Sequence, residues 1–177
     1  AELRFDTEFG GQPGHQLFAG IWSSRDVGLL QFAPQLLLPS GPALPTSSDS
    51  WALYWNFDQQ LVANPRHPGK GWGVFGRAAV ADEETNPIEY FLSFGVGGDS
   101  PLCGRENDRF GIGWYYAATS DSVPNFLLDD AGQGVELFYN VAVSPCLNVT
   151  PDIQFIEPAR RGVESTVVAG IRVSLAL

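Results

Sequence analysis

The chain has 177 residues, with 20 acidic and 10 basic side chains and a formal net charge of −10 at pH 7. This acidic balance, together with the lack of a basic aromatic patch, argues against nucleic acid as a partner. No segment has the continuous apolar run of a transmembrane helix. The length suits one domain, and because no linker or low-complexity tract divides it, we treat residues 1–177 as a single unit.

A two-residue alternation of apolar and polar side chains recurs along the chain. It occupies, in order, Ala1–Phe9, Gln16–Ser23, Trp51–Val62, Trp72–Val80, Ile88–Val96, Arg109–Ala118, Val135–Val143, Leu147–Phe155 and Ser165–Leu177. Successive side chains of a strand point to opposite faces, and no window carries a helical stripe of useful length. The pattern predicts about nine strands and an all-β fold.

The last of these ranges, Ser165–Leu177, shows the alternation clearly. Val167, Ile171 and Val173 fall on one face, whereas Arg172 and Ser174 fall on the other. A tilted strand of roughly 9 to 11 residues can cross a bilayer. Strands of membrane barrels show this alternation of lipid-facing apolar and lumen-facing polar residues and lack long apolar runs. The sequence therefore favours an antiparallel transmembrane up-and-down β-barrel.

The connections between the expected strands fall into two sets. If Leu177 ends in the periplasm, the periplasmic turns are Gly10–Gly14, Ala63–Lys70, Gly98–Asn107 and Ser144–Cys146. The external loops are then Ser24–Ser50, Asp82–Pro87, Leu127–Gly134 with its lead-in from Ser120, and Pro158–Glu164. Short periplasmic turns with longer external loops are the usual asymmetry of such barrels. Two aromatic girdles follow, with Trp51, Tyr90 and Tyr116 near outer strand ends and Trp72 and Phe110 near inner ends.

The odd number of strands indicates an incomplete barrel. Complete bacterial barrels normally have an even number of strands. An open sheet in lipid would also leave edge N–H and C=O groups unsatisfied, at a cost of several kcal/mol each. We therefore expect this chain to be the carboxyl-terminal part of a larger barrel, with the remaining strands supplied by an upstream segment or by another polypeptide.

Several motifs in a fixed order resemble the carbohydrate-selective porins of the OprB type. They are GWGVFGRAAVAD (Gly71–Asp82), NPIEYFLSFGVGG (Asn86–Gly98), DRFGIGWYY (Asp108–Tyr116) and GVELFYNVAVSPCLNVTPDIQFIEPAR (Gly134–Arg160). The resemblance implies a barrel of about sixteen strands in the bacterial outer membrane that passively admits small sugars. This chain would supply the carboxyl-terminal half or slightly more. It departs from the family in ending at Leu177, where such barrels usually end in Phe.

The predicted inward face carries groups that suit a sugar pore. Sugars offer hydroxyls to charged and amide side chains, and their C–H faces pack on aromatic rings. Interleaved charges of both signs suit neutral polar solutes better than ions of one sign. The candidate pore-lining residues are Arg77, Glu89, Phe91, Arg109, Tyr115, Glu136, Phe138 and Arg172. Of these, we expect Arg77, Glu89, Arg109 and Glu136 to act as a group; the alternative is that inward charges simply pair with one another.

Two cysteines lie in turns that are predicted to be periplasmic. Cys103 and Cys146 flank strands that should be neighbours, and the periplasm is oxidising, so a disulfide between them is expected. The alternative is two independent reduced thiols. His15 and His67 are isolated and read as solvated turn residues, and no cluster has the spacing of a metal site. We expect neither a metal nor a cofactor.

The sequence thus predicts a non-enzymatic outer-membrane porin. Its expected partners are small carbohydrate solutes, outer-membrane lipid and the remaining barrel strands. A soluble ligand-binding β-barrel, with an apolar interior and a polar exterior, is the main alternative. An outer-membrane barrel enzyme is less favoured, because no Ser–His–Asp or Cys–His constellation stands out.

Overall fold

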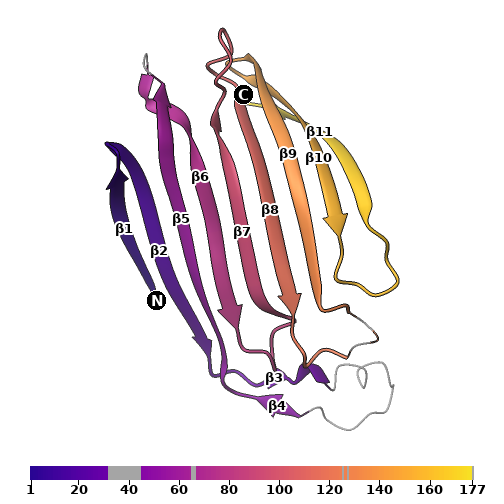
Figure 1. Cartoon of the computed structure of the whole chain (residues 1–177). Coiled ribbons are helices and arrows are strands. Elements are labelled where there is room, and N and C mark those ends of the chain that lie inside the picture. Colours follow the sequence, from indigo (N-terminus) through magenta and orange to yellow (C-terminus); the bar gives the residue numbers. More distant parts are fainter. Residues whose placement is uncertain (32–44, 65–66, 125, 127, 177) are drawn as a thin grey trace.

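A computed structural model describes residues 1–31, 45–64, 67–124, 126 and 128–176; of residues 67 and 68 it describes only the backbone. The described residues form one antiparallel sheet of nine strands in the order β1-β2-β5-β6-β7-β8-β9-β10-β11 (Figure 1). The strands are β1 (Glu2–Phe9), β2 (Gln12–Ser23), β5 (Ser50–Asn64), β6 (His67–Ala81), β7 (Ile88–Asp99), β8 (Arg109–Thr119), β9 (Ala131–Ser144), β10 (Leu147–Glu157) and β11 (Thr166–Leu175). A separate short pair joins β3 (Val27–Gly28) to β4 (Thr46–Ser47).

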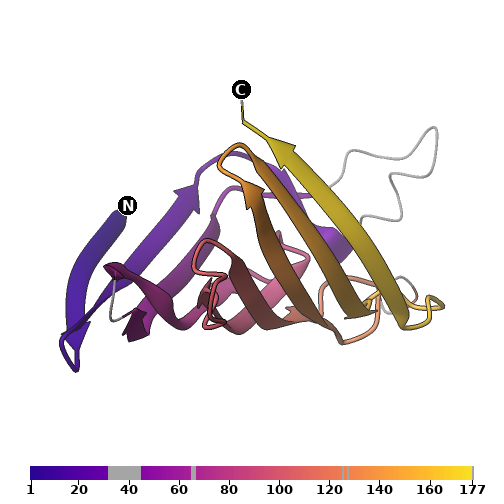
Figure 2. The same ribbon diagram turned by 90° about the horizontal axis from the view of Figure 1, so that it is seen from above.

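The sheet curves into an open arc (Figure 2). Each strand pairs with its neighbour in the meander, while β1 and β11 have one partner strand each within the described ranges. No helix in the described part of the chain is long and apolar enough to cross a membrane. The arc therefore has two free edges, one along β1 and one along β11.

All nine predicted strands are confirmed, and most are longer than the alternation indicated. Strand β2 begins at Gln12 rather than Gln16, because the turn before it needs only Gly10 and Gly11. Both glycines have positive φ, 58° and 76°, as a tight two-residue hairpin requires. Pro13 fits inside the strand because the ladder with β5 starts only at Gly14, so its missing N–H breaks no bond on that side.

The turn between β5 and β6 is also shorter than predicted. Strand β6 starts at His67, so the backbone of His67 lies in a strand and not in a turn. Residues 65–66 of the predicted turn, residues 32–44 of the predicted long loop, residues 125 and 127 of the predicted loop from Ser120 to Gly134, and Leu177 lie outside the described residues. The small β3–β4 pair inside the long loop was not predicted.

The connections alternate between two ends of the sheet, as the sequence predicted (Figure 1). The turn end carries the β1–β2, β5–β6, β7–β8 and β9–β10 hairpin turns. The loop end carries the longer connections between β2 and β5, β6 and β7, β8 and β9, and β10 and β11. Which end faces the periplasm stays a prediction.

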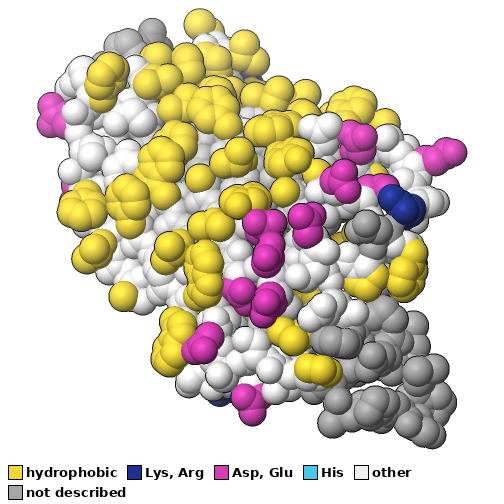
Figure 3. Space-filling view, turned by 60° about the horizontal axis from the view of Figure 1, so that its bottom comes forward, with side chains coloured by type: hydrophobic (Ala, Val, Ile, Leu, Met, Phe, Trp, Pro, Cys, Tyr) yellow, Lys and Arg dark blue, Asp and Glu magenta, His cyan; other side chains and the backbone are white. Residues whose placement is uncertain are grey.

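One face of the sheet is almost wholly hydrophobic. The strand register places Phe57, Gly76, Phe94, Trp114, Val135, Phe155 and Val167 in a single row across seven strands. Most of the large residues in this row are exposed. In the space-filling view hydrophobic side chains cover a broad area, and acidic side chains gather toward the loop end (Figure 3). Those loops contain Asp82, Glu83 and Glu84.

The sheet has no hydrophobic interior of its own. Among the described residues Ala19 is the only buried hydrophobic one, and the other buried residues are polar or are glycines. A single curved layer cannot cover its own apolar face, so that face must be covered by something other than this sheet. The buried polar residues lie in the turns and loops instead.

Asp108 is the most deeply buried of these polar residues and fixes the β7–β8 turn. It is 1% exposed and accepts hydrogen bonds from Nε of Arg105 at 2.6 Å and from the backbone N–H of Ala142 at 2.9 Å. Burial alone would raise the pKa of its carboxyl, but the hydrogen bonds from Ala142, the Tyr139 hydroxyl and Arg105 together hold that pKa below its ordinary value. The turn is thereby tied to β9.

Candidate pore wall

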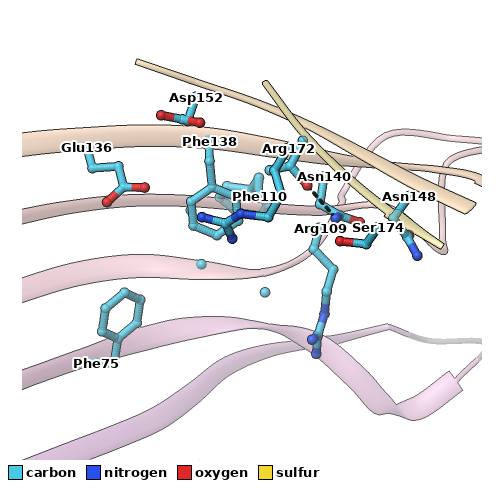
Figure 4. A pocket seen from close by; sticks show the side chains of 14 residues that line it. Phe75, Arg109, Phe110, Glu136, Phe138, Asn140, Asn148, Asp152, Arg172 and Ser174 are labelled. Atoms are coloured by element: carbon cyan, nitrogen blue, oxygen red, sulfur yellow. Dashed lines mark hydrogen bonds between the residues drawn. The ribbon is translucent and has the colours of Figure 1, made fainter. Parts of the chain in front are cut away.

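A hollow of about 640 Å³ lies on the face opposite the hydrophobic one. Its lining residues come from β6 through β11, and four strands lie between β6 and β11 in the sheet. Residues from such distant strands can share one hollow only on the concave side of the arc. The lining includes Phe75, Arg109, Glu136, Phe138, Asn140, Asp152, Arg172 and Ser174 (Figure 4).

The hollow carries charges of both signs. Arg109 is 69% exposed and lies 3.7 Å from a carboxylate oxygen of Asp99. Glu136 and Arg172 form no ion pair within 4.0 Å with any other described residue. Asn140 donates a hydrogen bond to Thr150 at 2.7 Å. The hollow therefore keeps charged donors and acceptors available to a solute.

A second group of concave-face residues lies closer to the loop end. Nε of Arg77 donates to Oδ1 of Asn56 at 2.6 Å, and its guanidinium carbon lies 5.6 Å from the ring centre of Tyr54. The rings of Phe91 and Tyr115 stack with centroids 6.3 Å apart and planes 13° apart. This group therefore combines aromatic ring faces with the guanidinium group of Arg77, which its contacts with Asn56 and Tyr54 keep in place.

A third group was missed by sequence reasoning. His15, which we expected in a solvated turn, lies in β2 and its Nδ1 is 2.8 Å from Oδ2 of Asp58. Its Nε2 is 3.9 Å from Asp6 of the neighbouring strand. Sequence reasoning missed this contact because Pro13 and Gly14 are typical turn residues. The predicted strand therefore started at Gln16 and left His15 outside it.

In the structure the predicted pore-lining residues lie in separate groups and not in one cluster. Arg109, Glu136, Phe138 and Arg172 line the hollow together, and Phe91 and Tyr115 stack on each other as a pair. Glu89 stands apart, at an irregularity where β7 and β8 lose register, and its carboxylate accepts a hydrogen bond from Tyr90.

The expected group of four charges is not assembled. Arg77 lies in the row of Ser93 and Tyr115, six residues along β8 from Arg109. At the usual rise of a strand this separation is about 20 Å. Only Arg109 and Glu136 of the four share the hollow.

The predicted disulfide is also wrong, since Cys103 and Cys146 are both free and exposed. They lie in two consecutive hairpin turns, β7–β8 and β9–β10. Equivalent points of consecutive hairpins are two strand spacings apart, or about 10 Å. A disulfide requires Cα atoms within about 7 Å.

Among the residues that the structure describes, no cluster of three or more His, Cys, Asp or Glu side chains could hold a metal ion. The polar groups of the concave wall are spread along several strands rather than gathered around a point. Such a wall can offer successive weak contacts to a polar solute.

An antiparallel meander with a hydrophobic convex face and a polar, charged concave face defines the wall of a transmembrane β-barrel. The model of the OprB family of carbohydrate-selective porins matches residues 1–177, and the chain belongs to that family. The resemblance seen in the sequence motifs is therefore confirmed.

Two relatives of the chain are longer proteins, and the chain matches only part of each. It is 26% identical over 136 residues to Porin B of Pseudomonas aeruginosa, a match that covers 65% of this chain and 30% of that protein. Its fold matches the high-pH structure of Pseudomonas putida OprB with a TM-score of 0.84 and 22% identity, over 98% of this chain and 47% of the other. The chain thus spans less than half the length of each.

Proposed function

We propose that the chain forms the carboxyl-terminal portion of a bacterial outer-membrane porin through which small sugars diffuse passively. The solute crosses through a water-filled lumen, and the width and the polar and aromatic lining of that lumen select it. The family to which the chain belongs and the names of both relatives support this proposal. A channel, rather than an enzyme, is the activity that this family suggests.

The observation that carries the proposal is the polarity of the two faces. Phe94 and Trp114 lie on the convex face, whereas Arg109, Glu136 and Arg172 line the concave hollow. A soluble ligand-binding barrel needs the reverse arrangement, with apolar residues inside and polar ones outside. A barrel surrounded by lipid and filled with water needs the arrangement found here.

The concave wall supplies the contacts that a neutral sugar can use. The guanidinium groups of Arg109 and Arg172 donate hydrogen bonds, and the carboxylate of Glu136 accepts them. The ring of Phe138 offers an apolar surface to the C–H face of a sugar. Because both charge signs are present, the wall has no strong preference for ions of one sign.

The free edges of β1 and β11 support the proposal that further strands complete the barrel. Each edge carries a row of backbone N–H and C=O groups that would cost several kcal/mol apiece if left unpaired in lipid. We propose that these strands come from an upstream segment or from another polypeptide. Outer-membrane lipid would then cover the convex face.

A liposome-swelling assay with the complete barrel tests this function. Glucose should enter and swell the vesicles faster than a charged solute of equal size. The same assay on vesicles without protein gives the background rate. A closed, inserted barrel that admits no glucose would remove the sugar-pore proposal.

A further inference from the structure

Aromatic residues face glycines directly across the strands of this sheet. Register pairs Phe75 with Gly95, Tyr115 with Gly134, and Phe138 with Gly111 on the concave face. A fourth pair, Phe57 with Gly76, lies on the convex face. A glycine opposite an aromatic residue leaves space above its backbone that the ring can enter.

Each of the three concave rings occupies that space. A Cβ added at Gly111 would lie closer than 3.0 Å to two ring carbons of Phe138, and its three nearest neighbours are all atoms of that ring. A Cβ at Gly134 would lie 2.7 Å from Cε1 of Tyr115, and one at Gly95 would lie 2.7 Å from Cε2 of Phe75. The rings therefore lean across the wall over the glycines.

The glycines also leave a low floor between two of the rings. On β7 and β8, between Phe75 of β6 and Phe138 of β9, the two adjacent rows contain only glycines at the concave face, namely Gly95, Gly97, Gly111 and Gly113. Gly97 and Gly111 line the hollow of about 640 Å³. The hollow is open at Gly97 and Gly111 because neither residue carries a side chain, whereas Gly113 is not among its lining residues.

We propose that Gly95, Gly111 and Gly134 are positioning residues. Because each lacks a side chain, the aromatic ring opposite it can lie flat against the pore wall. A ring in that position presents its face to a passing sugar and does not obstruct the lumen. This inference rests on the proposed sugar-pore function and names how the wall is shaped for it. A side chain at any of the three glycines would tilt the ring into the lumen.

Gly113 provides a matched control. It lies two residues from Gly111 on the same strand and the same face, but the nearest atom to an added Cβ is the backbone oxygen of Phe94, 3.9 Å away. An alanine there adds the same methyl group to the same wall without meeting a ring. Any effect of strand propensity or of added volume alone should appear equally at both positions.

The test compares Gly111→Ala, Gly113→Ala and the unchanged complete barrel in planar bilayers. The block of ion current by glucose gives a half-saturating concentration, and the open-channel conductance reports the width of the lumen. Gly111→Ala should raise the half-saturating concentration roughly threefold to tenfold, the range of one aromatic contact. It should also lower the conductance, while Gly113→Ala should change neither.

A Phe138→Ala background separates positioning from general damage. If Gly111 acts through the ring, then Gly111→Ala should have no further effect once Phe138 is alanine. Equal behaviour of Gly111→Ala and Gly113→Ala, or an unchanged effect of Gly111→Ala without the ring, would overturn the inference. Should Gly111→Ala fail to insert, Gly134→Ala with and without Tyr115→Ala gives a second comparison, in which the part of the effect that remains without the ring is due to the contact of the added Cβ with the backbone oxygen of Phe155 at 3.0 Å.

The two readouts distinguish this inference from the proposed function. Absence of any glucose block in the unchanged barrel would contradict the sugar-pore function. The conductance comparison would still decide whether Gly111 holds the ring against the wall.

Discussion

Single residues in the turns fix the hairpins of a sheet that has no interior of its own. Asp108 is the clearest case, because its buried carboxylate accepts a hydrogen bond from Arg105 within the β7–β8 turn and another from the backbone N–H of Ala142 in β9, and so joins the turn to β9. A buried acceptor of this kind stabilises the fold only while its donors remain paired with it.

Replacing Asp108 with Asn should lower the free energy of unfolding by about 1–3 kcal/mol at neutral pH, since an ionic acceptor is lost inside a buried network. The folded-state pKa of Asp108 lies below its ordinary value of 3.8. Its contribution is therefore fully present above the unfolded pKa and is lost as the pH falls through the folded one. Urea unfolding of both proteins across this range should show the difference shrinking in acid.

Asp129→Asn is the control for this prediction. Asp129 is also paired with an arginine, Arg161 at 3.1 Å, but its side chain is 50% exposed. An exposed pair contributes little, so this variant should unfold almost like the unchanged protein. A loss as large as that of Asp108→Asn would contradict the role given to burial.

At the scale of the strand, the two faces should respond oppositely to the same substitution. Leu137 lies on the convex face of β9, and its neighbour Glu136 lines the concave hollow. Leu137→Arg should cost about 2–4 kcal/mol of stability in lipid if the residue lies near the bilayer centre. Glu136→Arg should insert normally and shift the ion preference toward anions, because it adds positive charge to the lumen.

Denaturant titration in lipid vesicles and reversal potentials in a salt gradient measure these two effects. Normal stability of Leu137→Arg, together with unfolding of Glu136→Arg, would show that the faces have been assigned the wrong way round.

Strands were predictable from sequence because alternation is a local property. Each of the nine runs carries its own two-residue pattern, so the strand β11 was visible without its partner β10. Strand ends were less predictable. Pro13 and Gly14 are typical turn residues, yet they lie in β2 because two positive-φ glycines had already made the turn.

The grouping of side chains was less accessible, because it depends on register between strands. Arg77 and Arg109 both face the concave side, as predicted, but the register places them in different rows of the wall. Residue type also did not reveal the role of the glycines, which appears only when each is placed opposite its ring. The spacing of the two cysteine turns likewise depends on the number of strands between them.

For the assembled barrel, a channel requires that the concave face of the sheet meets water. The sheet is an arc with a hydrophobic outside and a polar inside, and only a closed barrel makes the inside a channel. Its family and its fold match that of a porin over nearly the entire chain. The decisive question is therefore whether the concave face lines an aqueous path.

Thiol accessibility on β7 of the complete barrel answers that question most directly. With Cys103 and Cys146 changed to serine, a single cysteine is placed at Ser93 on the concave face or at Phe94 on the convex face. A membrane-impermeant charged thiol reagent should react at Ser93→Cys and reduce the ion current, and should leave Phe94→Cys unmodified. Reaction at Phe94→Cys with none at Ser93→Cys would contradict the account.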